Sequence, residues 1–183
     1  MLSTSESHKA ELQRIGDLLS KEAYEIEVLP ASDLVPYDRL LVRLESFEEK
    51  NRIWQLEMSF LPGLEKEIDD VSILQCFVAL SDGSPDEYRN SLSQLIVKLN
   101  VKLPIGCFGL LDNPRMLFFK HNAMLPNDNH DVSWQVVREL VPMIAYLITT
   151  FSEALIQVAT GHRTIEKAIA DMPFSDVFGK ATE

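Results

Sequence analysis

The segment IWQLEMSF at residues 53–60 decides the fold. Its large apolar residues recur at every second position, which is the period of a β-strand with one buried face. The side chains that share this face are those of Trp54, Leu56, Met58 and Phe60. A sheet face this apolar must be covered, so the segment predicts a sheet with helices packed on it.

Three other strands are predicted around this one. In the first, Tyr24, Ile26 and Val28 alternate with two glutamates, and Pro30 ends the strand. The second lies near residues 40–44 and the third is the apolar run at residues 71–80. A helix precedes them all, because Leu12, Ile15, Leu18 and Leu19 have helical spacing before Lys21.

A helix and a hairpin are predicted next. Ser84 is expected to cap a helix that carries an apolar face and ends at Asn100. Two strands at residues 105–111 and 116–121 then flank the turn-forming residues 112–115. The sequence GCFG at residues 106–109 is no phosphate-binding loop, so its glycines are expected to ease a bend or close packing in the hairpin.

A last long helix is predicted from Trp134 to Val158, with Asp131 or Ser133 as its cap and a kink or a break at Pro142. Its apolar residues cover most of the circumference, which predicts a surface for a partner or a homodimer. That surface comprises Trp134, Leu140, Ile144, Leu147, Ile148, Phe151 and Leu155. Residues 141–159 approach the length of a membrane span, but they include Glu153, and membrane insertion is not expected.

These elements predict an α+β fold with an antiparallel sheet of five to six strands, helices packed on it, and the order α-β-β-β-β-α-β-β-α. Residues 1–183 are expected to form a single domain, with a core at 1–160 and a C-terminal extension at 161–183 that includes a short helix near 164–172.

Charge limits the classes of partner. The 183 residues include 17 basic and 28 acidic ones, a net charge of −11, which disfavours nucleic acid and anionic membranes. Residues 25–70 hold 12 acids and five bases. This is typical either of an acidic face for a basic or flexible polypeptide or of a surface that only gives solubility.

Few residues indicate catalytic chemistry. The sequence has no GxxxxGK[ST], GxGxxG or GxSxG motif, and we predict no catalytic residue, cofactor or metal ion. The alternative is a small-ligand or metal-binding protein or enzyme that uses His121, His130 and Asp128, which are close in sequence. The carboxylates at residues 65–70 are expected to be a solvated connector.

Two cysteines are too few for a disulfide framework, which predicts a reducing, cytoplasmic location. Cys107 lies among apolar residues and is expected to be buried. It could approach His121 on the neighbouring strand, but a reactive thiolate would need an exposed, positive setting.

The segment LIVKLNVKLPIGCF at residues 95–108, followed by MLFFKH at 116–121, resembles the YbjN-like family, which has a type III secretion chaperone-like fold. This resemblance implies a non-enzymatic protein: a small acidic dimeric chaperone that holds partner segments extended along its surface, or a regulator of sensory transduction. It brings no catalytic residues. We therefore expect a protein-interaction module, chaperone-like or regulatory, that forms a homodimer and binds a protein or peptide.

Overall fold

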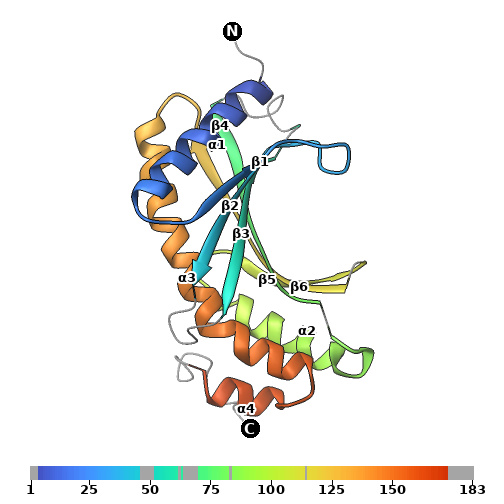
Figure 1. Cartoon of the computed structure of the whole chain (residues 1–183). Coiled ribbons are helices and arrows are strands. Elements are labelled where there is room, and N and C mark those ends of the chain that lie inside the picture. The colour runs from blue at the N-terminus through green and yellow to red at the C-terminus, as the bar shows by residue number, and fades with distance from the viewer. Residues whose placement is uncertain are drawn as a thin grey trace. The chain divides into compact units, whose positions relative to one another are not determined.

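The computed structural model describes residues 4–45, 52–61, 63, 70–82, 84–113 and 115–172. Most of the predicted acidic connector, residues 64–69, lies outside them. The described residues form, in chain order, α1 (Thr4–Lys21), β1 (Ile26–Leu29), β2 (Arg39–Glu45), β3 (Ile53–Phe60), β4 (Val71–Ser81), α2 (Asp86–Asn100), β5 (Cys107–Asp112), β6 (Arg115–Pro126), α3 (His130–Ala159) and α4 (Ile165–Ala170) (Figure 1). The strands make a single antiparallel sheet in the order β1-β2-β3-β4-β6-β5. The predicted fold class and element order are confirmed.

Two compact units divide the chain. Unit 1 comprises Met1–Val78 and His121–Ala145, and unit 2 comprises Ala79–Lys120 and Tyr146–Glu183. Charge is divided unevenly between them. Unit 1 has 19 acidic and nine basic residues, a net charge of −10, whereas unit 2 has nine and eight, a net charge of −1. The negative field of the protein therefore originates almost entirely in unit 1.

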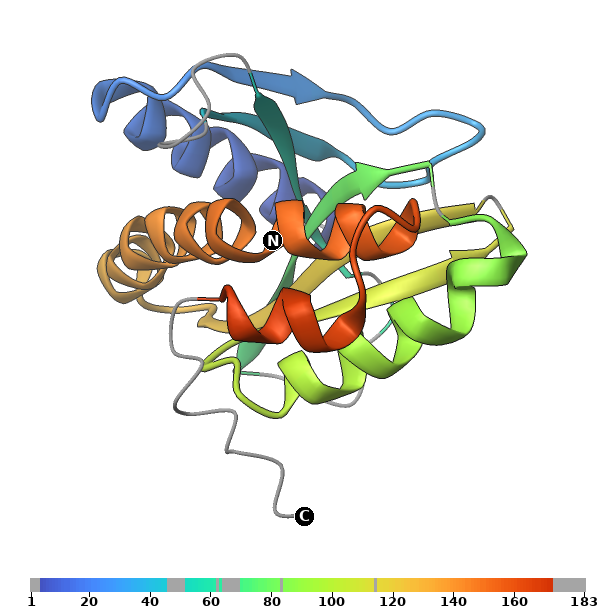
Figure 2. The same cartoon turned by 90° about the horizontal axis from the view of Figure 1, so that it is seen from below.

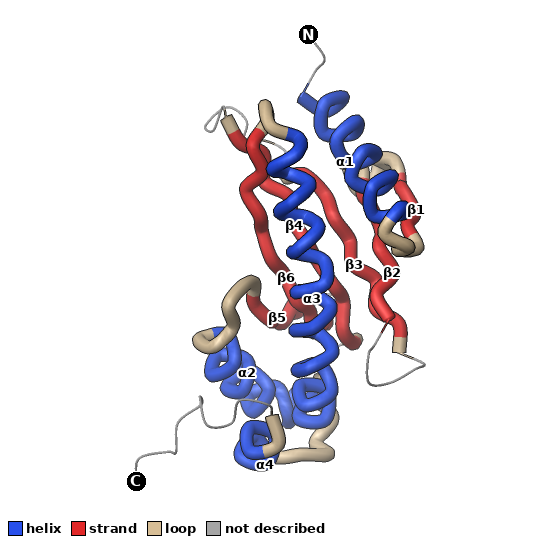
Figure 3. The backbone as a smooth tube through the Cα atoms, turned by 90° about the vertical axis from the view of Figure 1, so that its left-hand side faces the viewer, coloured by secondary structure: helices blue, strands red, loops and turns tan. Residues whose placement is uncertain are grey.

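In unit 1, α1 packs on β1 and β2 (Figure 1). Figure 3 shows α1 and the N-terminal part of α3 on the same side of these strands. The alternating side chains of β3 are buried as predicted, with Trp54 and Phe60 only 6% and 4% exposed. In the register, Leu40 and Met58 are opposite each other, and so are Val42 and Leu56. Burial of these side chains against the helices stabilises the unit by roughly 1.5–3 kcal/mol for each.

In unit 2, α2 packs on β5 and α4 (Figure 2). Phe108 on β5 makes edge-to-face contacts with Phe119 at 5.2 Å and with Phe151 at 6.4 Å between ring centroids. Gly106 has a φ of +65°, and a Cβ atom there would lie 2.8 Å from the Lys120 carbonyl oxygen. A Cβ at Gly109 would overlap the Phe118 ring. The packing role expected for these glycines is confirmed.

The predicted helix caps are wrong at two positions. Ser84 is buried and donates to the Ala159 carbonyl oxygen at 2.7 Å, so no side chain caps α2. At the start of α3 the amide of Val132 donates to Asn129 Oδ1 at 3.1 Å, and the buried Ser133 donates to the Pro126 carbonyl oxygen. A buried hydroxyl needs a partner, and here the carbonyl oxygen at the end of another helix or strand supplies it.

Two other elements are longer than the sequence predicts. α3 continues through Pro142, so the predicted break is wrong, because proline removes only the one helical bond to the Arg138 carbonyl. β6 extends to Pro126, whereas the sequence predicts a strand that ends at His121. The predicted short helix after Gly161 is confirmed as α4, where Thr164 caps the amide of Lys167.

Candidate functional site

The outer edge of β1 is the open end of the sheet. The Arg43 amide donates to the Glu25 carbonyl oxygen at 2.9 Å, and Ile26 is opposite Val42 in the register. In an antiparallel ladder alternate residues bond to the same neighbour, so Glu25 and Glu27 bond to β2. The N–H and C=O groups of Ile26 and Val28 therefore point outward. Among the described residues, no strand pairs with this edge.

The other edge of the sheet, at β5, is covered at one residue by a side chain. Asn100, the last residue of α2, donates from Nδ2 to the Phe108 carbonyl oxygen at 2.9 Å. Its Oδ1 accepts from the Phe108 amide, also at 2.9 Å. The amide group of Asn100 thus replaces a neighbouring strand at this residue. Sequence analysis identified Asn100 only as a helix stop, because an asparagine at a helix end does not reveal what its side chain contacts.

Acidic side chains line the open edge. Glu25 and Glu27 are exposed and lie on the same face of β1, and β1 carries no basic residue. Glu25 is paired with Arg43 at 2.8 Å. Glu27 makes no ion pair with any residue in the described part of the chain. Two copies of β1 side by side would bring like charges together, which destabilises such pairing.

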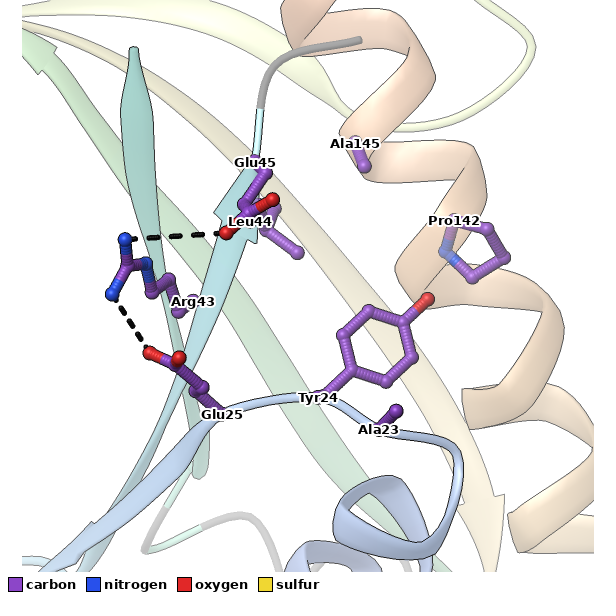
Figure 4. Close-up of a pocket in the computed structure, with 8 residues that line it drawn as sticks. All are labelled: Ala23, Tyr24, Glu25, Arg43, Leu44, Glu45, Pro142 and Ala145. Carbon is purple, nitrogen blue, oxygen red and sulfur yellow. Dashed lines mark hydrogen bonds and ion pairs between the residues drawn. The ribbon is translucent and has the colours of Figure 1, made fainter. Parts of the chain in front are cut away.

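A cavity of about 330 Å³ lies next to the start of β1 (Figure 4). Its apolar wall is made by the aromatic ring of Tyr24 and by Ala23, Leu44, Pro142 and Ala145. Its charged wall is made by Glu25, Arg43 and Glu45. Arg43 holds both carboxylates, with Nη1 2.8 Å from Glu25 Oε2 and Nη2 4.0 Å from Glu45 Oε1. All eight residues belong to unit 1.

The end of α1 positions Tyr24 in this cavity. Ala23 has a φ of +69°, and the amides of Ala23 and Tyr24 donate to the Ser20 and Leu19 carbonyl oxygens. This is the Schellman arrangement that ends a helix, here with alanine at the position that glycine usually occupies. Figure 4 shows the Tyr24 hydroxyl directed toward Pro142. Burial and the nearby charge of Glu22 raise the pKa of Tyr24, so its hydroxyl keeps its proton at neutral pH.

A second cluster in unit 1 joins His8, Ser72 and Asn127. Ser72 Oγ donates to Asn127 Oδ1 at 2.6 Å and lies 3.0 Å from His8 Nε2, while the His8 ring stacks on Phe60. Because the hydroxyl proton is directed to Asn127, His8 Nε2 must be the donor to Ser72. An activated serine needs the opposite direction, with the histidine accepting its proton. These hydrogen bonds hold the three side chains in place and do not activate the Ser72 hydroxyl as a nucleophile.

The three residues of the ligand-binding alternative are not brought together. His121 lies on β6, where burial lowers its pKa and favours the neutral ring. His130 begins α3 and its Nδ1 is 2.9 Å from Glu11 Oε2, whereas Asp128 is exposed in the connection between them. Among the described residues, no group of three histidine, cysteine or acidic side chains could hold a metal ion.

The prediction that Cys107 is buried is wrong. Cys107 is exposed on β5 and is opposite Lys120 in the register. Side chains of β5 alternate between the two faces of the sheet, and the alternation places Phe108 inward and Cys107 outward. Cys76 is the buried thiol, and burial raises its pKa to about 12.

The predicted partner surface on α3 is placed largely in the core. Leu140, Ile144, Leu147, Ile148, Phe151 and Leu155 are all buried within the chain, and Trp134 is half-buried. The exposed apolar side chains of α3 in unit 1 are instead Val132, Val136 and Met143. By length and composition α3 could also span a membrane, as the core helix of a soluble protein can, and 56% of its most apolar stretch is buried in the protein.

The chain matches no model of a known protein family and no curated protein. The resemblance to YbjN-like proteins stays a prediction. The sequence pattern places Tyr24 in a strand and a kink or a break at Pro142, and neither pattern indicates that the two side chains share a cavity.

Proposed function

We propose that the protein is a non-enzymatic interaction module that binds a segment of another polypeptide in extended conformation along the outer edge of β1. One observation carries this proposal: the N–H and C=O groups of Ile26 and Val28 point outward with no neighbouring strand. Such an edge is a template for pairing with another chain, and several peptide-binding domains bind their ligands in this way.

The contrast between the two sheet edges supports a function for β1. An open edge exposes a protein to aggregation, and proteins usually protect it. The β5 edge is protected at Phe108 by the side chain of Asn100, whereas β1 has no such cover among the described residues. Only charged side chains protect β1, and these still allow a partner of opposite charge to bind.

The partner we propose carries basic residues. A bound strand places alternate side chains beside those of β1, so lysine or arginine at every second position would face Glu25 and Glu27. The net charge of −10 in unit 1 attracts such a segment from a distance. A second copy of β1 brings glutamates instead and is disfavoured. Binding of an extended segment is also what the resemblance to chaperone-like proteins implies.

Selection from a library of random peptides tests the proposal. The full-length protein is the bait, and the selected peptides are then measured against Val28→Pro and Val28→Thr variants. Proline removes the outward N–H of residue 28 without breaking a bond to β2. Threonine keeps that N–H and, like proline, reduces the apolar surface of the side chain, so it is the control. We expect basic peptides that lose binding to Val28→Pro and retain it with Val28→Thr.

Peptides that bind both variants equally would place the binding surface elsewhere and overturn the proposal. A library that gives no binder to the wild-type protein would also overturn it. Circular dichroism of Val28→Pro, with a spectrum and melting temperature close to those of Val28→Thr, shows that any loss of binding is not a loss of folding.

A further inference from the structure

We propose that the cavity beside Tyr24 binds an organic cation, an ammonium group on an apolar stem. The cavity and the β1 edge share Glu25, but the outward backbone groups of the edge belong to Ile26 and Val28, which do not line the cavity. The inference therefore goes beyond the proposed function and can fail or succeed independently of it. The ligand could be a free alkylamine or a lysine side chain, because both carry an ammonium group on a hydrocarbon stem.

The hydrogen-bonding groups of the lining side chains favour a donor. Arg43 is their only cationic donor, and both of its terminal nitrogens face carboxylates, those of Glu25 and Glu45. Arg43 donates one hydrogen bond, to Glu25 at 2.8 Å. The acceptors of the lining side chains are the carboxylate oxygens of Glu25 and Glu45, and the Tyr24 hydroxyl can accept as well as donate. An ammonium group offers three donors and no acceptor, so it complements this set.

Charge at the cavity favours a cation as well. Two carboxylates face one guanidinium, so the lining carries a net negative charge. Glu45 is the less engaged of the two: its carboxylate is 4.0 Å from Arg43, and its side chain is 77% exposed. A cation can approach it without displacing the shorter Arg43–Glu25 pair. The field of unit 1, with its net charge of −10, adds long-range attraction.

The apolar wall fits the stem of such a ligand. Pro142 is exposed and offers hydrocarbon surface, and the half-buried Tyr24 adds an aromatic ring, whereas Leu44 and Ala145 are only 2% and 6% exposed. An ammonium group near the face of a tyrosine gains a cation–π attraction of roughly 0.5–1 kcal/mol at an exposed site.

Titration of the full-length protein with n-butylammonium chloride, followed by two-dimensional amide NMR, tests the inference. We expect saturable shifts at the lining residues, and weaker or absent shifts with n-butanol, the neutral analogue, and with butyrate, the anionic one. Glu45→Gln should weaken n-butylammonium binding about threefold to fivefold. Asp17→Asn is the matched control, because it removes the same charge from an exposed site on α1 that does not line the cavity.

Two variants of Tyr24 distinguish the contribution of its ring to binding from that of its hydroxyl. Tyr24→Phe should keep most of the affinity for n-butylammonium, and Tyr24→Leu should lose about threefold or more, because only the first keeps the aromatic face. A capped lysine, N-acetyl-lysine methylamide, distinguishes the two sources of the ligand. Tighter binding than n-butylammonium identifies a polypeptide side chain, and weaker binding identifies a free amine.

Three results would overturn the inference. Equal binding of n-butanol and n-butylammonium would make the cavity merely apolar. Preferential binding of butyrate would make Arg43 an anion site. An equal loss of affinity in Glu45→Gln and Asp17→Asn would mean that only the overall charge of unit 1 matters. None of these outcomes affects the β1 edge, which the Val28→Pro and Val28→Thr pair reports separately.

Discussion

The side-chain amide of Asn100 forms a closed pair of hydrogen bonds with the backbone of Phe108, donating to its carbonyl oxygen and accepting from its N–H, both at 2.9 Å. One side chain therefore ends α2, fixes the start of β5 and covers the sheet edge at this residue. Phe108 is 1% exposed, so neither of its backbone groups can readily turn to water instead. This pair covers the edge of unit 2 at Phe108, whereas no described residue covers the edge of unit 1 at Ile26 and Val28.

Asn100→Ala should lower the free energy of unfolding by about 2 kcal/mol, because it removes two hydrogen bonds and leaves a buried N–H and C=O unpaired. Urea denaturation measures the change. Asn100→Asp is the matched variant: its carboxylate still accepts from the Phe108 amide, but its other oxygen then faces the Phe108 carbonyl oxygen, so at pH 7 its loss should be at least as large. A loss below about 0.5 kcal/mol in Asn100→Ala would contradict the role assigned to the pair.

The two cysteines should differ sharply in reactivity. Cys107 is exposed, whereas Cys76 is buried and burial raises its pKa to about 12, so very little of its thiolate forms near pH 8. A colorimetric thiol assay at pH 8 should titrate one thiol in the native protein and two in guanidinium chloride. Cys107→Ser should leave no reactive thiol in the native state. Rapid labelling of Cys76 in native protein would show that its strand opens easily.

Stability should fall in acid because of Glu11. Burial raises the pKa of Glu11, but Arg14 and His130 outweigh it, so the folded-state pKa lies below its usual value of 4.5. A lowered folded pKa contributes stability that is present above pH 4.5 and is lost as the pH falls through the folded value. Urea midpoints between pH 7 and pH 3 should show a steeper decline for wild type than for Glu11→Gln. If the urea midpoints of wild type and Glu11→Gln fall equally with pH, Glu11 does not cause the loss of stability in acid.

The homodimer predicted from the sequence is tested by sedimentation equilibrium. If a second copy packs on α3, the accessible positions in unit 1 are Val132, Val136 and Met143, which repeat at helical spacing. The wild type should then sediment at twice 20.8 kDa, and Val136→Lys should return it toward 20.8 kDa. A wild-type protein that remains at 20.8 kDa at all concentrations would exclude the dimer.

The sequence predicts helices and strands well where the hydrophobic periodicity is strong. It misleads where a side chain contacts a residue far away in the chain. The alternation in β3 and the helical spacing in α1 were read correctly, because one buried face imposes each pattern. Ser84 was assigned to its nearest helix, yet it bonds to Ala159, which is 75 residues away. Local rules cannot weigh a tertiary partner of this kind.

The candidate site was harder to predict for the same reason. Tyr24, Arg43 and Pro142 come from three elements that are far apart in the chain, and none has a motif that points to the others. The buried residues of α3 also illustrate an ambiguity: a helix that is apolar all round can cover a partner or its own core. Composition alone does not choose between these, whereas the burial of Ile144 and Ile148 does.

Amide hydrogen exchange along β1, measured by NMR with and without a selected basic peptide, tests the central claim most directly. In the free protein the Ile26 and Val28 amides should exchange fast and the Glu27 amide slowly, because only Glu27 bonds to β2. Peptide binding should slow Ile26 and Val28 and leave Glu27 nearly unchanged. If the Ile26 and Val28 amides still exchange fast when the peptide is bound, the claim that partners add to this edge is contradicted.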